Sequence, residues 1–306
     1  MASAGRTLTT FVIEVVAEEG CTLPWFPGHE TRAAFLAAVR RVSESLAETL
    51  HSGVEVGVRG RRSVMSLKAL RMVSKVRWVK VEDEGRTPLR FGPGSRLGQR
   101  ALVEPGATGW FSVTILDEGV AREAVTTIPS IMGEELTLGP CRLRATTLRI
   151  EVVDVGKLLE EAPEDWESID TYFLTPTYLN PIKGDARYKI LYPEINALLA
   201  NLIATAHHTT NQNYPKPEEL ANKTYISGID IKTPKTKPNE NTAPTGFIGW
   251  TKIRPREKTD PKTKKLIAHL LKLAEKTNTG GNRSAGYGET KTKINTQENQ
   301  KQPPTP

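Results

Sequence analysis

The stretch KKLIAHLLKLAEKTNTGGNRSAGYG, residues 264–288, decides the fold. Its apolar residues recur at steps of three and four, which predicts a helix over residues 260–275 with one buried face. Glycine then occupies four of the nine positions 280–288, which predicts a loop over residues 278–288. A last strand is expected from Tyr287, so the stretch supplies the final helix and strand of an α+β unit.

The rest of the second half completes this unit. Residues 170–179 read as a strand, and residues 193–206 read as a helix that begins with proline. Residues 225–232 and 246–253 alternate apolar and polar side chains, as strands with one wet face do. The predicted order is therefore strand, helix, two strands, helix and strand, which is the order of a ferredoxin-like unit.

The first half follows a similar plan. Residues 8–16 are rich in β-branched side chains and predict a strand, and apolar residues at helical spacing predict one helix over residues 30–50. Further strands are expected at residues 63–70, 76–81, 109–116, 136–138 and 142–153, with a short helix after Asp117. This half is also predicted to be α+β with a mainly antiparallel sheet.

The chain has 306 residues, which suggests two domains at roughly 150 residues each. We predict an N-terminal domain over residues 1–168, a C-terminal domain over 169–294 and a disordered tail over 295–306. Residues 160–167 form an acidic connector that contains a proline. Arginine outnumbers lysine 17 to 4 up to residue 168, and lysine outnumbers arginine 17 to 4 beyond it.

The excess of positive charge lies in the second half of the chain. The net charge is +7, and residues 169–306 hold 21 Lys and Arg against 12 Asp and Glu. Such a surface suits a polyanion such as RNA, although a solvated basic face would have the same composition. No run approaches the about 18 apolar residues of a membrane helix, and no secretory signal is seen, so we expect a cytoplasmic protein.

Cys21 and Cys141 are the only cysteines and lie 120 positions apart. Neither a zinc-ligand spacing nor a disulfide framework can be read from two isolated cysteines. We therefore expect both to be core residues, and we expect no metal and no cofactor.

The glycine-rich loop is the strongest local signal for binding. Glycine lets backbone N–H groups approach a phosphate closely, and Arg283 would add a cation. A flexible turn explains the same composition. A nucleotide-cofactor loop does not fit, because such loops follow a strand and open a helix.

At this loop the sequence resembles the CRISPR-associated endoribonucleases that cut repeat RNA, within the RAMP superfamily. The resemblance rests on the apolar helix, the glycine-rich loop and the Gly-Tyr-Gly entry to the last strand. Residues 173–177 (FLTPT), 246–249 (GFIG) and 28–36 (GHETRAAFL) resemble further segments of that family in the same order. The resemblance implies two tandem ferredoxin-like (RRM-like) domains with mainly antiparallel sheets.

The resemblance also implies a chemistry. The ribose 2′-OH would attack the adjacent phosphate without a metal, leaving a 2′,3′-cyclic phosphate and a 5′-OH. His51 holds the position of the family's catalytic histidine, although a histidine at a helix end also fits a partner of the helix dipole. His29 is the competing candidate, and Arg61 lies near a position that is cationic in some members.

RNA affinity is expected from the glycine loop and nearby cations. The predicted RNA-binding residues are Gly280, Gly281, Arg283, Gly286, Gly288, Lys252, Arg59 and Arg62. Trp250 and Tyr287 could stack on bases, but aromatic side chains in strands are usually core. The implied partners are CRISPR repeat RNA and subunits of an effector complex, with the chain as a monomer or homodimer. The alternative function is a non-catalytic RAMP-type subunit that holds a guide RNA.

Overall fold

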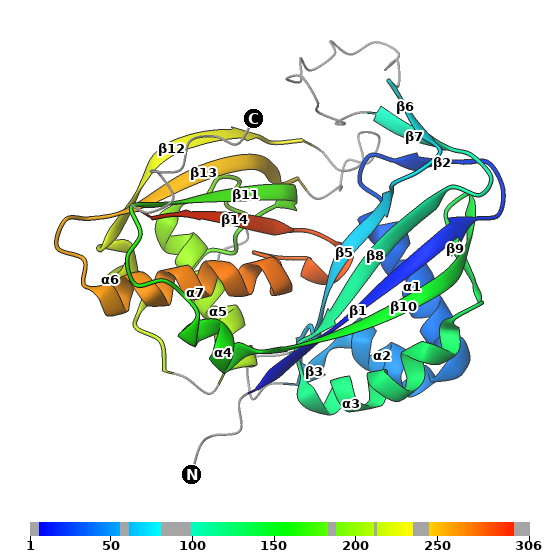
Figure 1. The fold of residues 1–306 in the computed structure, drawn as a ribbon, viewed down its shortest axis with the longest axis horizontal. Helices are drawn as coiled ribbons and strands as arrows, with labels where there is room; N and C mark the ends of the chain where they lie inside the picture. Colours follow the sequence, from blue (N-terminus) through cyan, green and yellow to red (C-terminus); the bar gives the residue numbers. More distant parts are fainter. Residues whose placement is uncertain are drawn as a thin grey trace.

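The computed structural model describes residues 6–55, 61–80, 99–182, 188–210, 213–234 and 245–296. Two sheet-and-helix halves follow one another along the chain and lie side by side (Figure 1). The turn-rich segment expected near residues 86–98 and the tail from residue 297 lie outside the described residues.

The N-terminal half is built on an antiparallel sheet. Within the described residues its strand order is β5-β8-β1-β10-β9. The bounds are β1 Thr7–Ala17, β5 Met65–Met72, β8 Thr108–Ile115, β9 Glu135–Leu138 and β10 Cys141–Asp154. The long central strand β1 pairs with both β8 and β10, so the order of the first four strands is that of a ferredoxin-like unit.

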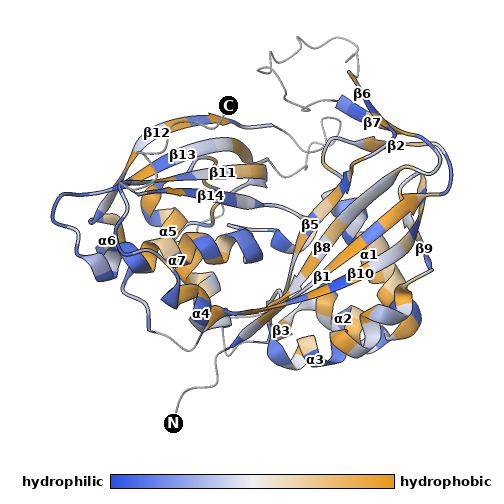
Figure 2. Cartoon of the chain, in the orientation of Figure 1, coloured by the Kyte–Doolittle hydropathy of each residue, from blue (hydrophilic) through white to orange (hydrophobic). Residues whose placement is uncertain are grey.

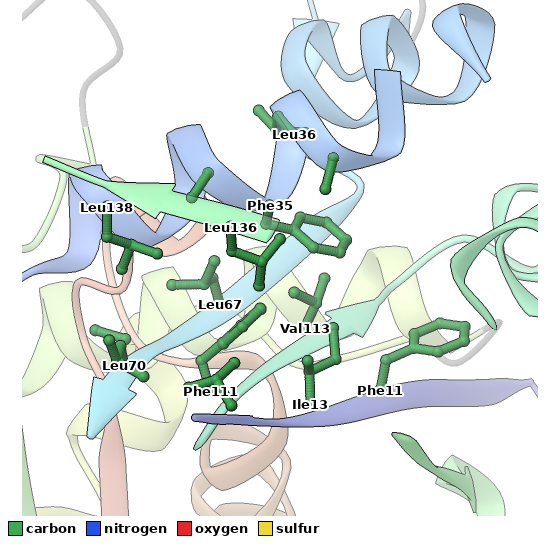
Figure 3. Packing of buried hydrophobic residues seen from close by; sticks show 14 of the residues in the cluster. Phe11, Ile13, Phe35, Leu36, Leu67, Leu70, Phe111, Val113, Leu136 and Leu138 are labelled. Carbon is green, nitrogen blue, oxygen red and sulfur yellow. The ribbon is translucent and has the colours of Figure 1, made fainter. Parts of the chain in front are cut away.

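Three helices cover one face of this sheet: α1 Gly28–Val42, α2 Glu44–Ser52 and α3 Glu118–Thr127, the last followed by the short η2 Ile128–Ile131. Figure 3 shows Phe11, Ile13 and Phe111 of the sheet packed beneath α1. Phe35 of α1 meets Phe111 edge to face, with ring centroids 6.1 Å apart. Removing these side chains from water is the main stabilisation of this half.

The predicted single helix over residues 30–50 is wrong in one respect, because it is broken at Ser43. Ser43 is extended (φ −146°, ψ 108°), and its Oγ accepts a hydrogen bond from the N–H of Leu46. A serine in this conformation caps a new helix, so α2 starts in a new direction. The apolar spacing continues across the break, which is why periodicity alone did not reveal it.

A small sheet lies beyond β5; its strand at residues 76–80 was predicted, but the other two strands were not. It has the order β2-β7-β6, with β2 Cys21–Pro24, β6 Val76–Lys80 and β7 Gln99–Val103. Cys21 of β2 and Cys141 of β10 form a disulfide, with Cα atoms 5.2 Å apart. Cys141 is fully buried in the first core and Cys21 packs against that core, as expected, but the disulfide between them was not predicted. The fold brings together two strands that are 120 residues apart, which spacing along the chain cannot show.

The C-terminal half carries the sheet β12-β13-β11-β14 among the described residues. The strands are β11 Ser168–Thr177, β12 Thr224–Lys232, β13 Phe247–Pro255 and β14 Thr290–Asn295. The helices α5 Ile195–Thr209 and α7 Pro261–Thr277 cover one face, with the short α4 Val155–Glu160 and α6 Pro217–Ala221 beside them. The predicted tandem ferredoxin-like α+β fold is thereby confirmed.

The C-terminal half shows the expected alternation of apolar and polar side chains, with the apolar side chains of its helices facing the core. In Figure 2, α7 carries hydrophobic and hydrophilic stretches together, while β14 is coloured mostly hydrophilic. The buried face of α7 contributes Ile267, Leu270 and Leu271 to the hydrophobic core of the C-terminal half, the second core of the protein. None of the described helices is long and apolar enough to cross a membrane.

One titratable side chain lies in this second core. His269 of α7 is fully buried, and its Nε2 lies 3.4 Å from the hydroxyl of Tyr214. Burial lowers the pKa of His269 to about 4, because the charged imidazolium would lose its hydration. The folded protein therefore holds this ring neutral.

We expect the free energy of unfolding to fall as the pH drops from about 6.5 towards about 4. In that window the unfolded chain binds a proton at His269 that the folded chain excludes, which costs about 3 kcal/mol of stability by pH 4. Urea unfolding of wild type and His269→Leu at pH 7 and pH 4.5 measures the effect. If both proteins lose the same stability, His269 is not responsible.

Candidate functional site

The two halves meet at residues 278–289, between α7 and β14. Asn278 is fully buried, and its Nδ2 donates to the backbone oxygens of Leu67 on β5 (2.9 Å) and Tyr287 (3.0 Å). Tyr287 is also fully buried and meets Phe26 edge to face at 5.0 Å. The loop is therefore tightly packed and makes direct contacts with the N-terminal half.

Glycine is required where this loop touches the N-terminal half. Gly286 has φ +80°, and an added Cβ would lie 3.1 Å from the Cβ of Ala69. On the other side of the contact, a Cβ at Gly28 would overlap the carbonyl oxygen of Ala285, in the short helix η3 Arg283–Ala285. Only glycine allows the start of α1 and the loop to approach this closely.

The other loop glycines pack against the end of β11. A Cβ at Gly280 would overlap the carbonyl oxygen of Tyr178, and one at Gly281 would overlap the Tyr178 ring. The N–H of Gly281 donates to Tyr178 (3.1 Å), and the N–H of Gly288 donates to Pro176 (3.0 Å). These glycines thus serve close packing of the chain, and their predicted contact with phosphate stays a prediction.

Arg283 points into the protein. Its Nη1 donates to Thr205 Oγ1 on α5 (2.9 Å) and to the carbonyl oxygen of Thr277 (3.4 Å). Burial lowers the pKa of Arg283 to about 10, so the side chain remains charged at neutral pH. In this arrangement Arg283 fastens the loop to two helices, and its predicted contact with RNA stays a prediction.

The candidate catalytic histidine lies close by, at the end of α2. His51 is exposed, and Arg32 of α1 reaches it: Arg32 Nη2 lies 3.2 Å from His51 Nδ1 and donates to the His51 carbonyl oxygen at 3.1 Å. His29 stands one turn before Arg32 on the same helix, and its ring meets Tyr287 at 5.6 Å. The structure thus brings His51 into contact with Arg32, and His29, one turn earlier on α1, into contact with Tyr287 of the glycine loop.

The contact with Arg32 determines which nitrogen of His51 carries a proton. A guanidinium has only donors, so Nδ1 must accept, and the neutral ring keeps its proton on Nε2. The exposed ring can therefore offer an N–H to a ligand oxygen. Burial lowers the pKa of Arg32 without removing its charge at neutral pH.

Arg32 is the residue that sequence reasoning missed. It lies within the GHETRAAFL motif, but only its charge was visible there. Its spacing of three residues from His29 places both side chains on one face of a helix, and this spacing was the available signal. That α2 folds back to bring His51 to the same face depends on the break at Ser43.

The other predicted cations are only partly placed. Arg59 lies outside the described residues. Arg61 and Arg62 form β4 (Arg61–Arg62), which pairs with β3 (Val54–Glu55) directly after α2. Lys252 lies on β13, 3.6 Å from Asp170 Oδ1. Among the described residues, no group of three His, Cys, Asp or Glu side chains could hold a metal ion.

We expect Gly280→Ala to lower the free energy of unfolding by about 2 kcal/mol or more. The added methyl group would overlap the Tyr178 carbonyl oxygen at a positive φ, so the loop must shift. Asn282→Gly is the matched control, because Asn282 is exposed and already has φ +51°. Denaturant unfolding compares the two; equal stability would contradict the packing role of the loop.

Residues 172–290 match the family model described as the CRISPR-associated endoribonuclease Cas6. No curated protein sequence matches the chain. The resemblance seen in the sequence is confirmed over this region.

Solved structures of Cas6 proteins share the fold over nearly the whole chain. A Cas6 product complex superposes with a TM-score of 0.64 at 19% identity, covering 94% of this chain and 100% of that chain. Cas6 from Thermus thermophilus gives 0.61 at 18% identity, covering 95% and 100%. A Cas6-related protein from Pyrococcus furiosus gives 0.54 at 10% identity, covering 95% and 99%. At these identities the likeness concerns the fold.

Proposed function

We propose that this chain, whose second half carries the Cas6 family signature, is an endoribonuclease that cuts precursor CRISPR RNA within its repeats. We place the reaction in the cytoplasm and assign it no metal. The observation that carries the proposal is the contact of His51 with Arg32, beside His29 and the packed glycine loop.

The reaction is an internal transfer of a phosphate. The 2′-oxygen forms a bond to phosphorus, its proton passes to a base, and the bond from phosphorus to the 5′-oxygen breaks. The 5′-oxygen takes up a proton, which leaves a 2′,3′-cyclic phosphate and a 5′-OH. Negative charge builds up on the phosphorane between these steps, so a nearby cation lowers the barrier.

The residues of the site fit these roles. His51 is assigned as the acid in its imidazolium form: protonation of Nδ1 ends the contact of that nitrogen with Arg32, which keeps its bond to the His51 carbonyl oxygen, and the imidazolium can then pass its Nε2 proton to the 5′-oxygen. His29 is assigned as the base for the 2′-OH. Arg32 orients His51 and supplies charge to the phosphorane, and the part that the sequence suggests for Arg59, Arg61 and Arg62 at the phosphate stays a prediction.

We expect His51→Ala to lower the single-turnover cleavage rate of a cognate repeat by about 10²- to 10⁴-fold, the usual loss for a general acid or base. The dissociation constant should change by less than about threefold. Glu48→Ala is the matched control, because Glu48 is an exposed side chain on the same helix as His51. A wild-type rate for His51→Ala would refute the assignment of His51.

The same experiment addresses the alternative function. If wild type and His51→Ala both bind the repeat tightly and neither cuts it, the chain acts as a guide-RNA-binding subunit. In that case His51 is a helix-end residue held by Arg32.

We expect Arg32→Ala to lower the single-turnover cleavage rate at saturating protein by about 10²-fold, since a donor and a charge beside the reacting phosphate are lost together. Arg40→Ala serves as the control, because Arg40 is an exposed arginine on the same helix. Rapid-quench assays at saturating protein separate this rate from RNA affinity. Equal rates for the two variants would remove Arg32 from the mechanism.

A further inference from the structure

The uncovered face of the C-terminal sheet carries aromatic side chains. In Figure 1, α5 and α7 lie on one side of β12, β13, β11 and β14, and no described helix lies on the other. On that open face Tyr172 of β11 stands in register between Trp250 of β13 and Lys291 of β14. Two aromatic rings therefore lie on neighbouring central strands.

These rings are accessible. Tyr172 is 37% exposed, and the next residue on this face, Leu174, is 44% exposed. Trp250 is half-buried and lies across Gly228 of β12, where an added Cβ would be 3.1 Å from the indole ring. Because Gly228 has no side chain, the indole of Trp250 can lie flat over it, next to the ring of Tyr172.

Lysines border the aromatic pair. Lys291 and Lys293 of β14 are exposed on this face. Lys252 of β13 is next to Asp170 in the neighbouring row, with Nζ 3.6 Å from Asp170 Oδ1. Asp230 of β12 is in register with Trp250 and is also exposed, so two carboxylates stand among three ammonium groups and this part of the face keeps a net charge of +1.

We propose that this face, defined by Tyr172, Trp250, Lys252, Lys291 and Lys293, binds an unpaired single strand of RNA. Bases stack on aromatic rings whatever their identity, and lysines on the flanks meet the phosphates between them. A paired helix cannot use this face in the same way, because its bases already stack on one another. The face is termed the stacking platform below.

The platform continues towards the candidate catalytic residues. Leu174 and Ile248 at its end line a cavity of about 320 Å³ that also contains Trp25 and Trp78. The cavity is bordered by Ala69, the residue that Gly286 touches from the loop. A strand that leaves the platform here arrives beside the glycine loop and the start of α1.

The inference rests on the proposed function in one respect: if the chain cuts CRISPR repeats, the single strand bound here would be the unpaired part of the repeat. Binding of single-stranded RNA can be measured without cleavage. The two proposals can therefore fail separately.

The test uses the full chain and a fluorescein-labelled 12-nucleotide oligouridylate, followed by anisotropy. We expect Tyr172→Ala to weaken binding by about 10-fold, the usual loss of one stacked base. Lys291→Ala should make the salt dependence shallower by about 0.7 in the log–log slope, as for one phosphate contact on a single strand. Tyr192→Ala is the control, since Tyr192 is 53% exposed and lies before α5, outside the platform.

Trp250→Leu provides a second variant, and circular dichroism confirms that each variant is folded. If folded Tyr172→Ala and Trp250→Leu both bind the oligouridylate within twofold of wild type, the platform is refuted, even if the chain cuts repeats. If both lose affinity while the control does not, the platform stands, even if no repeat is cut.

Discussion

The close approach of residues 278–289 to β5 and to the start of α1 is the contact on which the rest of the structure depends. Asn278 donates to backbone oxygens on both sides of this junction, and Gly28 and Gly286 remove the Cβ atoms that would keep the halves apart. A buried amide without these partners would cost stability, so the junction tolerates little change. It holds the second half beside His29, Arg32 and His51, which all come from the first.

The order of elements could be predicted from the sequence because it depends on local patterns. The spacing of apolar residues predicts alternating strands and amphipathic helices, and the ferredoxin-like order of the second half follows from the order of these elements. The break at Ser43 and the disulfide of Cys21 with Cys141 could not be predicted. The break depends on a serine cap within an apolar pattern that continues across it. The disulfide depends on which strands, distant in the sequence, become neighbours in the fold.

The candidate site was predicted in part for the same reason. His51 and His29 were found through a motif. The structure joins His51 to Arg32, which lies one turn after His29 on α1, and this contact depends on how α2 folds back onto α1. The glycine loop was singled out for phosphate binding, whereas its glycines here permit close packing and Arg283 faces inward. Glycine composition marks a close approach but does not say what approaches.

The two halves divide the work in this account. The first supplies the reacting groups, and the lysine-rich second half supplies the open sheet face and the loop that connects it to those groups. The central claim is that the 2′-OH of the RNA is the nucleophile and that no metal is required. The direct measurement incubates the protein in EDTA with end-labelled repeat RNA, and with a copy that is 2′-deoxy at the nucleotide before the cut. The account predicts cleavage of the first and none of the second; cleavage that EDTA abolishes, or that the 2′-deoxy copy still undergoes, would contradict it.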